Sequence, residues 1–159
     1  MQAPARIQPR SLNDYLGVMS KSVFQSGLFW KVVESKWPTT RDALQRFDPK
    51  IVASLTDEDL DELTQDTRLI RSRRKLNAVV HNARRILELE LELEQELELE
   101  QEQEHGGFQN YLRSHGDFEN TLKDIKKRFK FLGDAGTFHF LWVVGEGVPD
   151  YEEWCKVHH

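Results

Sequence analysis

A short stretch in the last third of the chain, residues 129–137, has the composition of a phosphate-binding turn. It contains Gly133 and Gly136, and it lies between a basic segment with Lys126 and Lys127 and an apolar segment. Where two helices meet in such a turn, backbone N–H groups and the positive end of the second helix can hold a phosphate without reading a base. An ordinary helix–helix turn, whose glycines supply positive φ angles, has the same composition. The pattern therefore indicates either a nucleic-acid contact or a plain connection.

The net charge of −5 is unevenly distributed along the chain. Nine of the 27 acidic residues lie in one Leu/Glu tract between Ile86 and Glu104, so the remainder carries 22 Lys+Arg against 18 Asp+Glu (27 less 9). The basic residues gather in two clusters, over 68–85 and 123–130. Such clusters can neutralise phosphates, although a charge run is also typical of a solvated helix face.

Length and composition exclude several classes of protein. The 159 residues suffice for one domain with a core, and no apolar run reaches the roughly 20 residues that a membrane span needs. Residues 1–10 lack the apolar core of a signal peptide. One cysteine, Cys155, excludes an internal disulfide and suits a reducing compartment. We therefore expect a cytoplasmic protein with no membrane partner.

Almost every segment has a helical pattern, which predicts an all-α fold. Apolar residues recur at helical spacing over 12–36, and Trp37-Pro38 predicts the end of that helix. Together with capping signals, the pattern predicts helices over 12–36, 39–47, from 49, from 56, from about 71, and near 108–114, 118–128, 134–144 and 149–156. Many short capped helices with brief loops favour an orthogonal helical array in a single domain, 1–159.

The tract that starts at Leu87 alternates Leu and Glu strictly. Alternation is the period of a β-strand, but Leu and Glu favour helices and the tract continues a helix already begun. We therefore expect a helical extension that frays near 101–105, as a low-complexity insertion at about 87–105. Self-association through its leucines is the alternative interpretation.

Several short motifs follow one another in an order that resembles a known enzyme family. They are Gln25-Ser26-Gly27-Leu28-Phe29-Trp30, Phe47-Asp48-Pro49, the run from Gln65 to Leu76, Asn82-Ala83-Arg84, and Arg128-Phe129-Lys130-Phe131-Leu132-Gly133. Together they resemble the DNA-3-methyladenine glycosylase I family, within the helix-hairpin-helix glycosylases, over about 12–87 and 118–144, as a divergent member. The resemblance implies a helical protein with a helix-hairpin-helix element. Such a protein binds double-stranded DNA, flips an alkylated base such as 3-methyladenine into a pocket and hydrolyses its N-glycosidic bond.

The resemblance also implies roles for individual residues. The family's hairpin grips the DNA backbone, and its Gln-x-Gly-Leu turn probes the duplex beside the lesion. With the neighbouring lysines, the residues expected on DNA are Gln25, Gly27, Leu28, Lys126, Lys127, Phe131, Leu132, Gly133 and Gly136. The family's pocket tryptophan matches Trp30, whose ring face could stack on a cationic purine, although a core tryptophan is the plainer interpretation.

The chain departs from the family pattern in three places. The family's pocket glutamate, eight residues before the tryptophan, is Ser22 here, which can hydrogen-bond but carries no charge. The family's N-terminal zinc ligands have no Cys or His counterpart, and its C-terminal ligands fall at Asp150 and Trp154. Cys155 and His158 have C-x-x-H spacing, but a structural zinc site needs four ligands, so we expect no metal and no cofactor.

These departures leave the catalytic group open. Asp150 and the other carboxylates that follow the hairpin helix, Glu146, Glu152 and Glu153, are candidates for a substitute. We expect His139, like the other histidines, to be structural or exposed. The alternative function is a non-catalytic DNA-binding relative that kept the hairpin, and a third is an interaction module built on the acidic tract.

Overall fold

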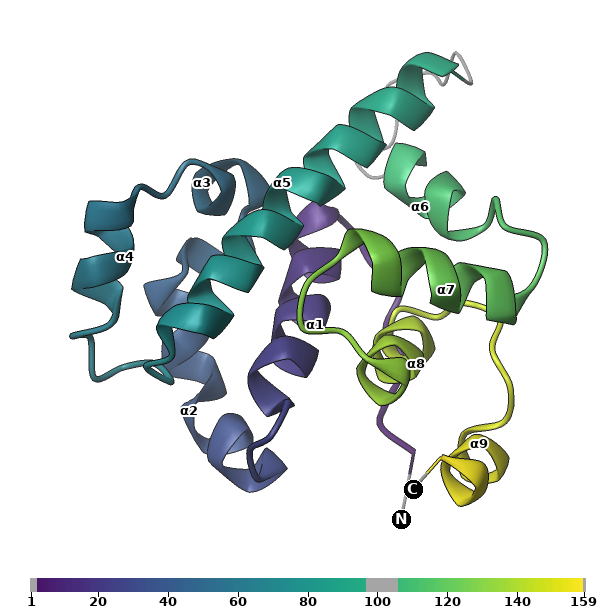
Figure 1. Ribbon diagram of the computed structural model, residues 1–159, viewed down its shortest axis with the longest axis horizontal. Coiled ribbons are helices and arrows are strands. Elements are labelled where there is room, and N and C mark those ends of the chain that lie inside the picture. Colours follow the sequence, from purple (N-terminus) through teal and green to yellow (C-terminus); the bar gives the residue numbers. More distant parts are fainter. Residues whose placement is uncertain (1–2, 97–105, 159) are drawn as a thin grey trace.

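The computed structural model describes residues 3–96 and 106–158, and every regular element in these ranges is helical, which confirms the all-α prediction (Figure 1). The helices are α1 (Leu12–Gln25), α2 (Trp30–Ala43), α3 (Pro49–Ala53), α4 (Asp57–Leu63), α5 (Arg73–Glu96), α6 (Gly106–Leu112), α7 (Phe118–Arg128), α8 (Asp134–Val143) and α9 (Tyr151–Val157), and a short turn, η1 (Gln45–Phe47), follows α2. None of the helices in the described ranges combines the length and the apolar composition that a membrane crossing would need.

Two helices form the centre of the molecule. α5 runs diagonally across it and packs against α1, α3, α4 and α6, and α1 packs in addition against α2 and α8 (Figure 1). Both helices bury an apolar stripe at helical spacing; the stripes are Tyr15, Leu16, Met19 and Val23 from α1, and Leu76, Val79, Ala83 and Ile86 from α5. Any side chain on the facing surfaces of α1 and α5 is therefore held in place by the core.

The boundaries of the first two helices differ from the expected ones. A break at residues 26–29 separates α1 from α2, because Gly27 adopts φ +74°, a left-handed conformation. α2 then continues through Pro38 to Ala43, so the predicted end at Trp37-Pro38 and the predicted start at Thr39 are both wrong. Packing explains the continuation, since the Trp37 ring stacks on Phe47 at 5.1 Å.

The Leu/Glu tract is helical as far as Glu96, which confirms helix over strand; the expected fraying at 101–105 lies outside the described residues. Leu89 belongs to the hydrophobic core. The buried Glu90 carboxylate accepts a hydrogen bond from the backbone N–H of Phe108 at the start of α6. α6 lies so close that a Cβ on Gly107 would collide with the Glu90 carbonyl oxygen. Leu89 and Glu90 are therefore part of the packed fold.

Candidate functional site

The turn between α7 and α8 does not use its glycines as an ordinary connection would. Positive φ occurs at Phe131 (+60°), whereas Gly133 has φ −89° as the N-cap of α8, and Gly136 lies inside α8. A Cβ on Gly133 would meet nothing within 4 Å, so this end of α8 is open. A Cβ on Gly136 would lie 3.8 Å from the Cβ of Ser22, an ordinary van der Waals contact, so α8 packs directly against α1 at this position.

α5 fastens this turn through two side chains. The buried Asn82 donates its Nδ2 to the Lys130 carbonyl (3.1 Å) and accepts the Lys130 N–H at Oδ1 (2.8 Å). The preceding residue is His81, whose Nε2 lies 3.1 Å from the carbonyl oxygen of Arg128. Because Asn82 satisfies both polar groups of one residue, it fixes the orientation of the turn's backbone.

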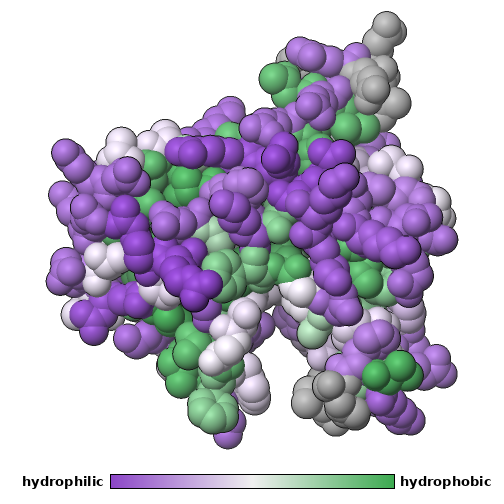
Figure 2. Space-filling model, viewed as in Figure 1, coloured by the Kyte–Doolittle hydropathy of each residue, from purple (hydrophilic) through white to green (hydrophobic). Residues whose placement is uncertain are grey.

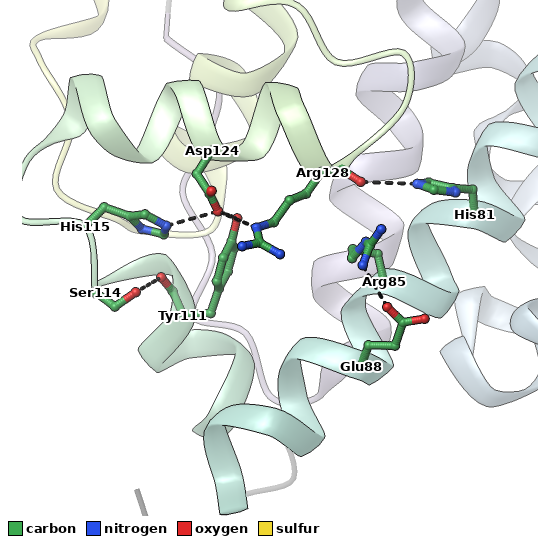
Figure 3. Close-up of polar contacts among 8 residues, drawn as sticks. All are labelled: His81, Arg85, Glu88, Tyr111, Ser114, His115, Asp124 and Arg128. Carbon is green, nitrogen blue, oxygen red and sulfur yellow. Dashed lines mark hydrogen bonds and ion pairs between the residues drawn. The ribbon is translucent and has the colours of Figure 1, made fainter. Parts of the chain in front are cut away.

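The helix that leads into this turn is anchored by a polar network around Asp124 (Figure 3). Its carboxylate accepts hydrogen bonds from the Tyr111 hydroxyl (2.5 Å) and from Arg128 Nε (2.8 Å), and it lies 3.1 Å from His115 Nε2. Burial acts to raise the pKa of Asp124, but these hydrogen bonds and the Arg128 charge outweigh it, so the net pKa is lowered. Asp124 is therefore ionised at neutral pH and holds α7 against α6.

α5 also fastens the turn between α1 and α2. The buried Lys75 donates its Nζ to the backbone carbonyls of Phe24 (3.0 Å) and Ser26 (2.5 Å), and burial lowers its pKa. Beyond these carbonyls, Phe29 and Trp30 are 83% and 60% exposed. Neighbouring exposed apolar side chains of this size mark a contact surface for a partner.

A cleft of about 480 Å³ opens between the two turns and α9. Figure 2 shows it as a notch in the lower edge of the molecule, between the green tip of the α1–α2 turn and α9. The lining residues from the two turns and their helices include Ser22, Gln25, Ser26, Phe131, Gly133, Asp134, Gly136 and His139, and those from α9 are Tyr151, Trp154, Cys155 and His158. The structure thus brings Ser22 and Gln25 together with residues of the α7–α8 turn.

The α9 side of the cleft is a column of stacked rings. Trp154 stacks on Phe138 at 4.2 Å, and His158 stacks on Trp154 at 4.0 Å. Tyr151 packs 5.7 Å from Phe138. α9 is therefore attached to α8 through aromatic contacts, which keep this wall of the cleft in a fixed position.

The proposed substitute carboxylates have structural partners. Asp150 is exposed and caps α9, where its Oδ2 accepts the N–H of Glu153 at 3.2 Å, and it does not line the cleft. The buried Glu146 carboxylate accepts hydrogen bonds from Nε and Nη2 of Arg113, each at 3.1 Å. Among the described residues, Asp134 is the one carboxylate that lines the cleft, and it pairs with Lys126 at 2.6 Å.

Most arginines of the first basic cluster contact other parts of the protein. The pairs are Arg68 with Asp66, Arg73 with Asp57 and Asp61, Arg84 with the Ala53 carbonyl, and Arg85 with Glu88. Arg74 is exposed and lies 5.4 Å from the Phe131 ring. Near the hairpin, Lys127 and Lys130 are exposed and form no ion pair with any described residue. The basic surface available to a ligand is therefore smaller than the sequence indicates.

The surroundings of Trp30, Leu132 and His139 bear on the roles expected for these residues. Trp30 is exposed and so is not a core residue, but it is not among the residues that line the cleft. Leu132, in the α7–α8 turn, is buried. His139, which was expected to be structural or exposed, lines the cleft 3.5 Å from Ser22 Oγ. Asn82 and Lys75 were not recognised as positioning residues, although both lie inside the motifs that carry the family resemblance.

The described residues contain no group of three or more His, Cys, Asp and Glu side chains that could hold a metal ion. Cys155 and His158 both line the cleft, but His158 is engaged in the ring column, and its Nδ1 lies 3.0 Å from the Trp154 carbonyl.

Comparison with known proteins identifies one family. The family model for methyladenine glycosylases matches residues 13–158. The DNA-3-methyladenine glycosylase of Haemophilus influenzae is 44% identical over 65 residues, which are 41% of this chain and 35% of that protein. DNA-3-methyladenine glycosylase 1 of Escherichia coli is 40% identical over 65 residues, with the same coverage. The matched stretch thus spans about a third of the length of these curated relatives.

Solved structures extend the likeness over most of the fold. A crystal structure of 3-methyladenine DNA glycosylase I superposes with a TM-score of 0.69 at 25% identity, covering 87% of this chain and 81% of that one. A variant of 3-methyladenine DNA glycosylase I in complex with 3-methyladenine superposes with a TM-score of 0.70 at 24% identity, covering 87% and 80%. The helical arrangement is therefore the one found in these enzymes.

Proposed function

The chain belongs to the methyladenine glycosylase family, and from this premise we propose that it is a DNA N-glycosylase of base-excision repair. Its substrate is double-stranded DNA that carries an alkylated base such as 3-methyladenine, and the bond hydrolysed is the N-glycosidic bond of that base. One observation carries the proposal: the two turns expected to touch DNA border a single cleft, and both are fastened by α5.

This reaction needs little catalytic assistance from the protein. The glycosidic bond of a methylated adenine is already weak, because the base leaves as a neutral molecule from a cationic ground state. The enzyme must extrude the base, stack it and position a water molecule. This suits a cleft in which Ser22 stands in place of a glutamate, since the positive charge is supplied by the substrate.

Different exposed residues bind the duplex, the flipped base and a phosphate. Leu28 and its neighbours on the α1–α2 turn enter the duplex beside the lesion, and Trp30 stacks on the base once it has left the helix. The open N-terminus of α8 at Gly133, with the exposed Lys127 on the helix that precedes the turn, holds a phosphate. Lys126 binds the same phosphate after its ion pair with Asp134 breaks. Reaction without metal or cofactor, in the cytoplasm, is part of the same proposal.

The test is single-turnover release of free base from methylated duplex DNA, with the released base identified. Wild-type protein is expected to release 3-methyladenine and to leave undamaged bases in place. Release of no base, with DNA binding intact, would favour the second candidate, a non-catalytic DNA-binding relative. A specific observation supports that candidate, because Asp134, the one carboxylate among the described residues of the cleft, is engaged by Lys126.

A further inference from the structure

A serine and a histidine from distant parts of the chain meet at the floor of the cleft. Ser22 on α1 is 5% exposed, and its Oγ lies 3.5 Å from His139 Nδ1 on α8. Gly136, one turn before His139, also packs against Ser22: a Cβ built on it would lie 3.8 Å from the Ser22 Cβ, an ordinary van der Waals contact. The contact is long, as polar contacts in ligand-free sites often are.

The other nitrogen of the ring is available to a ligand. Within the part of the chain that the structure describes, His139 Nε2 has no hydrogen-bond partner. His139 and Gln25 line both the cleft and a second cavity of about 680 Å³ between α1 and α2, so the ring lies where the two spaces meet. A polar atom in this position can be reached by a group that enters from the side of the two turns.

The charge of the ring is also constrained. Burial lowers the pKa of His139, and the nearby Lys21 ammonium acts in the same direction, so the imidazole is neutral at pH 7. The neutral ring has one donor and one acceptor nitrogen. If Nδ1–H donates to Ser22 Oγ, Nε2 becomes the acceptor.

We propose that His139, oriented by Ser22, accepts a hydrogen bond from the flipped base through Nε2 and so takes the recognition role that the family gives to a glutamate. The inference rests on the proposed glycosylase function. The donor is the exocyclic amino group of an alkylated adenine. A neutral acceptor tolerates the cationic base, whereas a protonated ring would repel it and could only donate. Specificity then comes from a hydrogen bond that a base without this amino group cannot form.

The first experiment measures binding without catalysis. Free 3-methyladenine is titrated into the full chain while the ring nitrogens are followed by ¹H–¹⁵N NMR, with His139→Gln used to assign the His139 signals. The protein alone should show the tautomer protonated at Nδ1, and the base should shift Nε2. A tautomer protonated at Nε2, or shifts confined to residues away from His139, would overturn the assignment.

The second experiment measures single-turnover release from methylated duplex DNA. His139→Ala should slow release about tenfold or more while leaving DNA affinity unchanged, because the lost contact is with the flipped base. His139→Gln should recover part of the rate, since an amide oxygen can accept. Ile51→Ala, which changes an exposed side chain on α3 that does not line the cleft, serves as the control. Equal rates for wild type and His139→Ala would overturn the inference and leave the glycosylase function standing.

The pH profile separates recognition from a merely structural role. Release should fall as the pH drops through the lowered pKa of His139, and His139→Gln should flatten that limb. The ionisable groups that face the ring or share its two cavities are Asp14, Lys21, Glu34, Arg41, Arg46, Asp134, Tyr151, Cys155 and His158. Their titration persists in His139→Gln, so an acid limb that survives this change belongs to them and contradicts the inference. If wild type releases no base, the NMR titration alone decides whether His139 binds it.

Discussion

The α1–α2 turn and the α7–α8 turn are positioned by the same helix, yet they present opposite chemistry. Lys75 fastens the first and Asn82 the second. The first ends in exposed apolar side chains, whereas the second carries exposed lysines and an open helix N-terminus. If both turns contact DNA as proposed, one acts by filling space within the duplex and the other by charge. The contributions of the two turns to the free energy of DNA binding should respond differently to salt, since only the second turn depends on neutralised phosphates.

Removing the largest apolar ring from the first turn should have the largest effect on activity. Trp30→Ala should slow base release by about 10- to 100-fold, the value of one base–aromatic stack, while duplex affinity and its salt dependence change little. Single-turnover release and anisotropy titrations measure the two quantities. Ile51→Ala, which removes a 42% exposed apolar side chain from α3, is the control. Unchanged release in Trp30→Ala would mean that the base stacks elsewhere.

Removing the hydrogen bonds between α5 and either turn should show which function that turn serves. Asn82→Ala leaves both polar groups of Lys130 unpaired and should cost about 1–3 kcal/mol of unfolding free energy. It should also lower duplex affinity. Lys75→Met removes the ammonium from two carbonyls and should reduce release more than affinity. Denaturant unfolding supplies the stability. If both variants lost base release and duplex affinity to the same extent, the two turns would not have separate functions.

Single charges beside the second turn should have smaller, salt-dependent effects. Lys127→Ala should lower affinity and reduce the slope of log K against log salt by about 1. Lys126→Ala should cost more, because it also leaves Asp134 unpaired next to the phosphate. Asp134→Asn should raise affinity. A salt slope that is the same in wild type and in Lys127→Ala would place the phosphate elsewhere.

The smallest effect expected is on acid stability. The folded-state pKa of Asp124 is lowered, so its contribution is present above the unfolded-state value of about 4 and is lost as the pH falls through the folded value. Asp124→Asn should remove this acid-side loss and should be less stable than wild type at pH 7. Thermal unfolding between pH 2.5 and 7 measures both. A wild-type curve that stays parallel to the Asp124→Asn curve would contradict the assignment.

Local signals predicted much of the fold correctly. The apolar stripes of α1 and α5 are core, and the expected capping pattern after residue 56 is present, with Thr56 and Asp59 each accepting the other's backbone N–H. The course of α2 through Pro38 could not be predicted, because the stacking of Trp37 on Phe47 depends on tertiary packing.

The candidate site was predicted less completely than the fold. The two turns were recognisable from motifs, but the partners of their charged residues were not, since Lys126 meets Asp134 only across the folded turn. Positive φ at Phe131 rather than at a glycine has no composition signal. Ser22 and His139 are 117 residues apart, so no local spacing connects them.

The spacing of Lys75 and Asn82 on α5 has a geometric consequence. Seven residues are close to two full turns, so both side chains lie on one face of the helix, about 10.5 Å apart along its axis. α5 thus fixes the distance between the exposed apolar side chains of the α1–α2 turn and the open N-terminus of α8. Inserting one residue between Lys75 and Asn82 would rotate one fastening by about 100° relative to the other. If both turns bind DNA as proposed, the offset between the probed base pair and the held phosphate belongs to the protein, whichever sequence surrounds the lesion.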